Sequence, residues 1–142
     1  MYEPIRAQQV AHRTVGDDRT TDYPHRSRGE ALDVQLAGHL TALLAVTDEL
    51  GLDESAERIA AQVARLRGDR PVHARRVRSG DAVTLHRRAH DLAARALVVA
   101  ASRADTAAAI LTAERMDAHA AAVGTLDPAG TRPPSLRAGE TP

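Results

Sequence analysis

The chain has 142 residues but no Phe or Trp and only two Tyr, and this shortage of aromatic rings limits the core that it can build. Leu, Ile and Val together make up 28 residues, which is near the lower limit for a chain that folds into a packed globule. Ala supplies a further 29 residues. Alanine is the best helix former, whereas strands favour aromatic and β-branched residues. The composition therefore predicts closely packed helices around one small aliphatic core.

Glycine and proline divide the sequence into segments. Pro is absent from residues 29–70 and from residues 72–127. Five glycines stand where breaks between helices are expected, namely Gly29, Gly51, Gly68, Gly80 and Gly124. We expect one helical domain over residues 29–123, with flexible tails over residues 1–28 and 124–142.

Two helices are expected in the first half of that domain. Ser27 and Glu30 have the spacing of a capping box, which predicts a helix over residues 29–50. A second helix is expected from a cap at Asp53 to a stop at Gly68. Apolar residues recur every three or four positions in both segments. The predicted buried stripes are Leu36, Leu40, Leu43, Thr47 and Leu50 in the first helix, and Ala56, Ile59, Ala60, Val63 and Leu66 in the second.

The second half of the domain has two possible architectures, because neither Gly nor Pro interrupts residues 81–123. One continuous helix would need a partner molecule to cover its apolar surface. We favour a hairpin of helices over residues 81–101 and 104–123, since Ser102 and Asp105 have the spacing of another capping box. The predicted seam of the third helix consists of Ala82, Ala89 and Ala96 at one heptad position and Leu85, Leu92 and Val99 at the other. The predicted buried residues of the fourth helix are Ala109, Ala113, Met116, Ala120 and Val123. The predicted fold is an all-α antiparallel bundle of about four helices.

Charge is segregated along the chain although the formal net charge is zero. Residues 29–57 contain seven acids and no Arg, whereas residues 58–95 contain ten Arg and three Asp. Oppositely charged helices can be neighbours within one molecule, where exposed ion pairs stabilise by ~0 to 1 kcal/mol each. Alternatively, the acidic segment of one molecule meets the basic segment of another, or the basic segment meets an acidic partner.

Two features that the sequence lacks bear on the cellular compartment of the protein. The chain has no Cys, which excludes disulfides, thiolate nucleophiles and cysteine-based zinc sites. It also has no apolar run long enough for a signal peptide or a membrane-spanning helix. We therefore expect a cytoplasmic protein that does not bind membranes.

The most basic segment is residues 69–80, and it is a candidate for nucleic-acid contact. Four arginines could bind phosphates there, namely Arg70, Arg75, Arg76 and Arg78. Together with the preceding Ala64 and Gly68, the segment has a weak similarity to a helix-turn-helix. The segment lacks Asn and Gln for contacts to bases, and the helical region has no aromatic ring for stacking. An ordinary solvated loop is the alternative that we favour.

Histidine spacing suggests a second candidate site, for a transition metal. His86 and His90 are four residues apart, so their imidazoles would lie on one side of the third helix. A site could be completed by His39 and Glu114 from other helices. The neighbouring Arg87 and Arg88 would repel a cation, and the Glu-x-x-His motif of carboxylate-bridged metal proteins is absent from the chain.

Catalytic and cofactor motifs are absent, so we expect a binding or scaffolding protein rather than an enzyme, with no cofactor and no identifiable small-molecule substrate. The sequence contains no glycine-rich phosphate loop and no Gly-x-Ser-x-Gly elbow. The first predicted helix has small residues opposite its Leu stripe, namely Ala31, Gly38, Thr41, Ala42 and Ala45. With the thin core and the alanine seam of the third helix, this face favours self-association, most simply as a homodimer.

Overall fold

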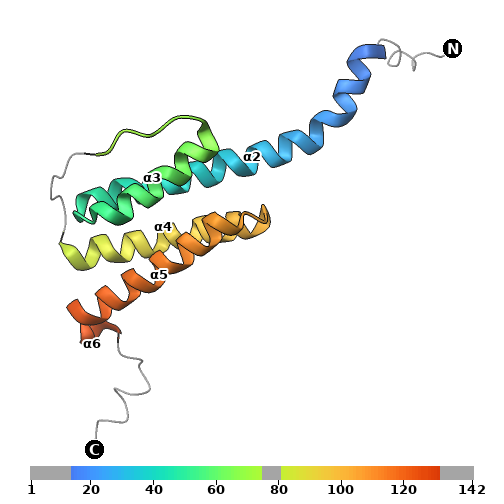
Figure 1. The fold of residues 1–142 in the computed structure, drawn as a ribbon. Coiled ribbons are helices and arrows are strands. Elements are labelled where there is room, and N and C mark those ends of the chain that lie inside the picture. Colours follow the sequence, from blue (N-terminus) through green and yellow to red (C-terminus); the bar gives the residue numbers. More distant parts are fainter. Residues whose placement is uncertain (1–13, 75–80, 132–142) are drawn as a thin grey trace, which may run out of the picture. The chain divides into compact units, whose positions relative to one another are not determined.

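The computed structural model describes the backbone of residues 14–74 and 81–131, and side chains within residues 27–74 and 81–130. All regular secondary structure in these ranges is helical, which confirms the all-α bundle (Figure 1). Four long helices pack against one another, and a short fifth helix follows them. The helices are α2 (Thr14–Glu49), α3 (Asp53–Arg67), α4 (Ala82–Ser102), α5 (Thr106–Leu126) and α6 (Pro128–Thr131).

The chain divides into two compact units, residues 1–33 and residues 34–142. Helix α2 contributes residues 14–33 to the first unit and residues 34–49 to the second. Because α2 begins at Thr14, the helix start predicted at Gly29 is wrong. Ser27 and Glu30 lie inside the helix, and their spacing marks a start only where the backbone also leaves the helix. The candidate sites described below lie in the second unit.

The turn between α2 and α3 ends one helix and starts the next. Gly51 has a φ of +75°, Leu52 N–H donates to Thr47 O (3.2 Å) and Gly51 N–H donates to Asp48 O (3.0 Å). This is a Schellman motif, for which glycine is the usual residue. Asp53 is the first residue of α3 rather than its predicted cap, and Leu52 before it supplies no capping side chain.

Two of the other predicted helix ends are confirmed. Gly68 ends α3 with a φ of +92°, and its N–H donates to Ala64 O (2.7 Å). Asp81 caps α4 by accepting a hydrogen bond from Thr84 N–H (2.7 Å), and the bonds to Thr84 lower the pKa of the Asp81 carboxyl group. The C-terminal boundary is different from the prediction, because α5 continues past Val123 to Leu126.

The hairpin of α4 and α5, rather than one continuous helix, is confirmed. The residue responsible for the break is not the one predicted. Ser102 remains in α4, where its Oγ donates to Val98 O (3.0 Å), and Asp105 is itself the cap of α5, accepting from Ala108 N–H (3.2 Å). The chain reverses at Ala104, which lies two residues after the end of α4.

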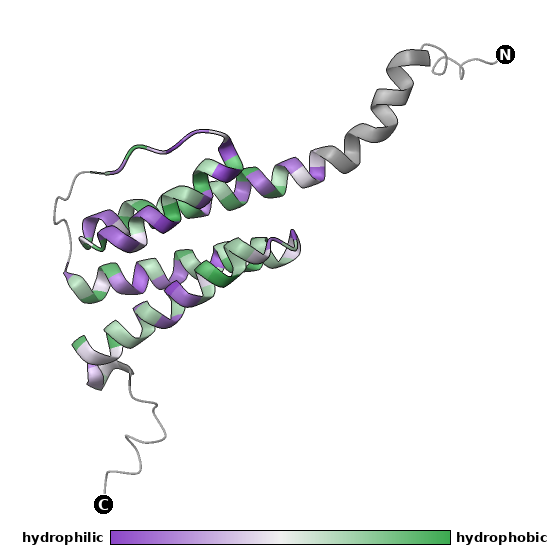
Figure 2. Cartoon of the chain, viewed as in Figure 1, coloured by the Kyte–Doolittle hydropathy of each residue, from purple (hydrophilic) through white to green (hydrophobic). Residues whose placement is uncertain are grey.

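Aliphatic side chains form the core, and the predicted stripes of the first three helices are largely confirmed. Buried residues include Leu36, Leu40, Leu43 and Thr47 of α2, Ala56, Ile59, Ala60 and Val63 of α3, and Leu85, Ala89, Leu92, Ala96 and Val99 of α4. Leu50 and Leu66 are only partly buried. Figure 2 shows hydrophobic and hydrophilic residues alternating along α3 and α4, as expected for helices with one buried face.

The buried face predicted for α5 is wrong except at Val123. Ala109, Ala113 and Met116 are only partly buried, and Ala120 is exposed. The face that is buried consists of Ala108, Leu111, Thr112, His119 and Val123. Alanine occurs on several sides of this helix, so it does not mark the core, and the true face contains two polar residues. Thr112 can be buried because its hydroxyl donates to Ala108 O (2.8 Å) within the helix.

Candidate functional site: an apolar pocket at the α4–α5 turn

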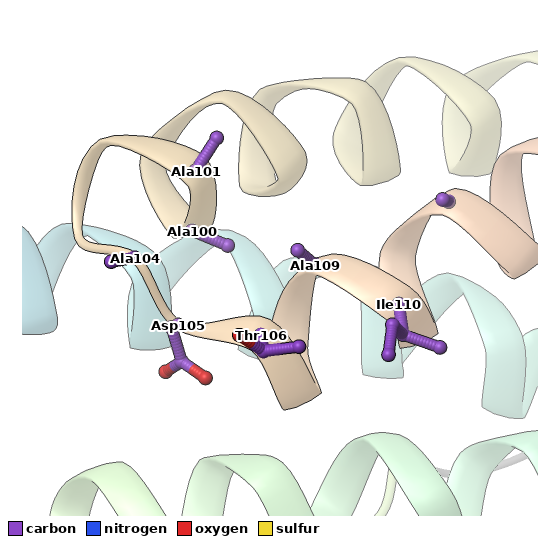
Figure 3. Close-up of a pocket in the computed structure, with 8 residues that line it drawn as sticks. Ala100, Ala101, Ala104, Asp105, Thr106, Ala109 and Ile110 are labelled. Carbon is purple, nitrogen blue, oxygen red and sulfur yellow. The ribbon is translucent and has the colours of Figure 1, made fainter.

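An apolar pocket of about 330 Å³ lies where α4 turns into α5. Figure 3 shows Ala100 and Ala109 directed into the space between the two helices, with Ala104 at the turn. The lining residues are Ala100, Ala101, Ala104, Asp105, Thr106, Ala109, Ile110 and Ala113. Five of these eight residues are alanines, which come from the two helices and the turn between them. Their side chains are short, so the pocket can accept a protruding apolar side chain.

Ala104 gives the turn its shape in a strained conformation. Its φ is +56°, the one positive value at a non-glycine residue among the described residues. Ala104 N–H donates to Ala101 O (3.1 Å) and Asp105 N–H donates to Ala100 O (2.8 Å), which again makes a Schellman motif. An L-residue in this region is strained by roughly 1 kcal/mol relative to glycine. Strained residues cluster at functional sites, and Ala104 lines the pocket.

Asp105 fixes the turn to helix α3. Its carboxylate accepts hydrogen bonds from Arg65 Nη2 at 2.8 and 3.0 Å, in addition to the cap at Ala108 N–H. Burial alone would raise the pKa of Asp105, but the hydrogen bonds from Arg65 and Ala108 outweigh it and the pKa is lowered. A second bridge between α3 and α5 joins Arg58 to Glu114 (2.6 Å). Two charged contacts therefore connect α3 to α5 and its cap, which form part of the pocket wall.

Ile110 projects from the edge of the pocket, with 54% of its surface exposed. The same side chain lines a second hollow of about 270 Å³, which α5 shares with Arg58, Ala61 and Gln62 of α3. Ile110 is therefore an apolar ridge between two hollows. Val98, one turn before the end of α4, adds a further exposed apolar side chain (66%) to the same hairpin.

A pair of histidines also joins α4 to α5. Along both helices, these histidines are many residues away from the turn. His86 Nδ1 and His119 Nδ1 are 2.9 Å apart, so one of the two donates to the other. His119 is fully buried, and its Nε2 has no hydrogen-bond partner among the described residues. Burial, reinforced by Arg115, His86 and His90, lowers the pKa of His119 to about 4. Burial and Arg115 also lower the pKa of His86, so the neutral form of both rings is favoured.

The four residues of the predicted metal site are not assembled into one. Glu114 pairs with Arg58 and His86 pairs with His119, while His39 is half-buried on α2. His90 lies beside Asp91 at 3.7 Å and lines an open hollow of about 390 Å³. Within residues 27–74 and 81–130, no group of three or more His, Asp or Glu side chains is arranged to hold a metal ion.

Of the four predicted nucleic-acid contacts, only Arg70 lies in the described part of the chain, and it pairs with Glu57 (2.5 Å). Arg75, Arg76 and Arg78 lie outside the described residues. The segment before them is fixed to the bundle by His73, whose Nδ1 lies 2.9 Å from Asp48 Oδ1 and whose Nε2 lies 3.0 Å from Glu57 Oε2. Acidic residues of α2 and α3 therefore pair with the start of the basic segment inside one molecule.

His73 and Asp48 form a clasp that sequence inspection missed. The nearly buried Asp48 carboxylate also accepts from Ala74 N–H (2.8 Å), and its hydrogen bond to His73 is the main reason that the pKa of His73 is raised. His119 was missed as well, because its partner His86 is 33 residues away. The segregated charge was the one sequence signal that pointed to the clasp.

The small-residue face of the first predicted helix is open to solvent at several positions. Ala31, Gly38 and Ala45 are exposed, and a side chain added at Gly38 would meet no atom within 4 Å. In contrast, Ala89 and Ala96 of the α4 seam are buried inside the bundle. Ala82, at the start of the predicted seam, is exposed. From Ala89 onward the seam packs within the molecule and is not available to a partner.

Comparisons with protein-family models, curated proteins and solved structures found no match to this chain. Among the described residues, no helix combines the length and the apolar character needed to cross a membrane. The candidate site therefore has to be interpreted from its own chemistry.

Proposed function

We propose that this protein is a non-catalytic helical bundle with a binding role, and that it associates with a second copy of itself through the α4–α5 turn. The observation that carries the proposal is the apolar pocket beside the exposed Ile110. Exposed apolar patches mark binding surfaces, because their transfer out of water is favourable. Val98 is a further exposed apolar side chain of the same hairpin, on α4.

The chemistry of the pocket supports binding rather than catalysis. Asp105 is the one charged residue in its lining, and this carboxylate already accepts hydrogen bonds from Arg65 and Ala108. A general base needs a carboxylate that can accept a proton from a substrate. With its pKa lowered by these bonds, Asp105 is suited to hold the turn in place rather than to transfer protons.

A second copy is the partner that this surface fits best. A twofold interface uses the same patch on both molecules, so the patch must be complementary to itself. The turn carries both a hollow lined by alanines and an exposed apolar side chain beside it. Association of this kind requires no disulfide, and the chain has no Cys. We propose from the sequence that the protein is located in the cytoplasm.

Sedimentation equilibrium of the full chain over a range of concentrations tests the proposal. We expect a dimer at tens of micromolar that dissociates on dilution. A strict monomer at the highest concentration would refute self-association.

A further inference from the structure

We propose that Arg115 on α5 binds a small oxyanion through its guanidinium group. Arg115 does not line the pocket at the α4–α5 turn. The anion site is therefore separate from the self-association surface, and it goes beyond the proposed function.

Arg115 lies on the buried face of α5. It is four residues after Leu111 and four residues before His119, both of which are buried. Residues four positions apart lie on the same side of a helix. Arg115 is itself partly buried, whereas the other arginines within residues 27–74 and 81–130 are all exposed. A charged side chain thus occupies a position that helical spacing assigns to the core.

This partly buried arginine has no acidic partner among the described residues. Charged side chains that leave water are normally paired with an opposite charge. Exposed arginines need such a partner less, yet several of them have one. The arginines that pair with carboxylates are Arg58, Arg65, Arg70 and Arg87.

The charge around Arg115 is positive. Glu114 pairs with Arg58 at 2.6 Å. Burial and the charge of Arg58 lower the pKa of Arg115, and the charge of Glu114 opposes them. Two guanidinium groups thus share one carboxylate, so this cluster of three side chains has a net charge of +1. An oxyanion would neutralise it, and the planar fork of a guanidinium group matches the oxygens of phosphate and carboxylate groups.

Two buried nitrogen atoms at this place have no hydrogen-bond partner. Arg115 Nε and His119 Nε2 are the buried side-chain N or O atoms without one within residues 27–74 and 81–130. The two residues are one helical turn apart on α5. A guanidinium nitrogen can only donate, and leaving a buried donor unpaired is unfavourable. An anion at Arg115 supplies the missing acceptor, and the partly exposed side chain can be approached from solvent.

Urea unfolding of the full chain in sodium phosphate, in sodium acetate and in sodium chloride of equal ionic strength tests the site. An anion that binds only the folded protein stabilises it in a saturable way. We expect phosphate or acetate to raise the urea midpoint of the wild type along a saturating curve, from which the Kd follows. Exclusion of phosphate from protein surfaces also stabilises folded proteins, but every variant shares this effect.

Arg115→Met removes the guanidinium group and keeps an unbranched apolar stem on the buried face. Its Kd for the anion should rise at least about tenfold, because hydrogen bonds to charged groups are the strong ones. Arg95→Gln is the matched control, since it removes the same charge from an exposed position on α4. Salt screens such a distant charge, so its Kd should stay within about twofold of the wild-type value.

Nuclear magnetic resonance of the wild type gives a readout that does not depend on the folding of any variant. The Nε–H signal of Arg115 should shift with anion concentration along the same saturating curve, whereas that of Arg95 should not. A midpoint that rises in neither phosphate nor acetate relative to chloride would overturn the proposal. So would an unchanged Arg115 Nε–H signal, or equal anion Kd values for the wild type and Arg115→Met.

Discussion

The two helical hairpins of the bundle reverse direction through the same hydrogen-bond pattern but with different residues at the critical position. The α2–α3 turn places Gly51 at a φ of +75°, whereas the α4–α5 turn places Ala104 at +56°. Glycine occupies this region without steric strain, but alanine does not. The first turn thus avoids steric strain, whereas the second retains a methyl group that lines the apolar pocket.

The hairpins also differ in how a histidine holds them. The clasp beside α2 and α3 surrounds His73 with Asp48 and Glu57, which raises its pKa and favours its charged form. The α4–α5 hairpin buries His119 beside Arg115 and His86, which lowers its pKa to about 4 and favours its neutral form. The clasp therefore stabilises the protonated form of His73, whereas the α4–α5 hairpin stabilises the neutral form of His119. Acid should favour the first contact and weaken the second.

The largest expected effect is acid destabilisation of the α4–α5 hairpin. In the unfolded chain His119 has the ordinary histidine pKa of 6.5, but in the folded protein it binds a proton only near pH 4. The stabilisation from this neutral histidine is complete above pH 6.5 and is lost as the pH falls toward 4, at about 1.36 kcal/mol per unit, or about 3 kcal/mol in all. Urea unfolding of the wild type and of His119→Gln at several pH values measures this slope.

The variant should have a weaker dependence on pH below 6.5, because its side chain cannot be protonated. Equal slopes in the wild type and in His119→Gln would contradict the role of the buried pair.

The next largest effect should follow substitution of the glycine in the first turn. Gly51→Ala introduces a side chain at a φ of +75° and should lower the free energy of unfolding by about 1 kcal/mol. Thermal or urea unfolding measures the change. No loss of stability would show that this turn tolerates alanine as well as the α4–α5 turn does.

The reciprocal change, Ala104→Gly, should raise the free energy of unfolding by roughly 0.5 kcal/mol. The gain is smaller than the relief of strain, because glycine also increases the conformational entropy of the unfolded chain. If the methyl group serves the interface, the same variant should self-associate more weakly than the wild type. Unfolding and sedimentation measured on one sample would therefore change in opposite directions, and a more stable variant with an unchanged dimer Kd would remove the functional reason for Ala104.

The difference between the turns also explains what the sequence could and could not predict. Gly51 and Gly68 identify helix ends because glycine is favoured at positive φ. Periodic Leu and Ile residues located the buried faces of three helices. Ala104 has no such sequence marker, so the break was predicted from Ser102 and Asp105, of which only Asp105 acts as a cap.

The candidate sites were less predictable than the helices, because they depend on contacts between distant residues. His86 and His119 are separated by 33 positions, and His73 and Asp48 by 25. Spacing along one helix suggested His86 with His90, but the fold pairs His86 with a histidine from α5 instead. The surface at Ile110 was hidden for a different reason: in an alanine-rich helix, periodicity did not distinguish the exposed side from the buried one.

The smallest effect should come from the His73 clasp, and it should have the opposite dependence on pH from that of His119. Because the pKa of His73 is raised in the folded protein, its stabilisation is fully present below pH 6.5 and is lost as the pH rises through the folded value. His73 is 38% exposed, so solvent screening should limit the effect of His73→Gln to a few tenths of a kcal/mol. Urea unfolding should show this loss at about pH 6 and little change at about pH 9. A loss that grows with pH would mean that His73 stabilises the clasp as a neutral ring, and the contrast between the two hairpins would then rest on burial alone.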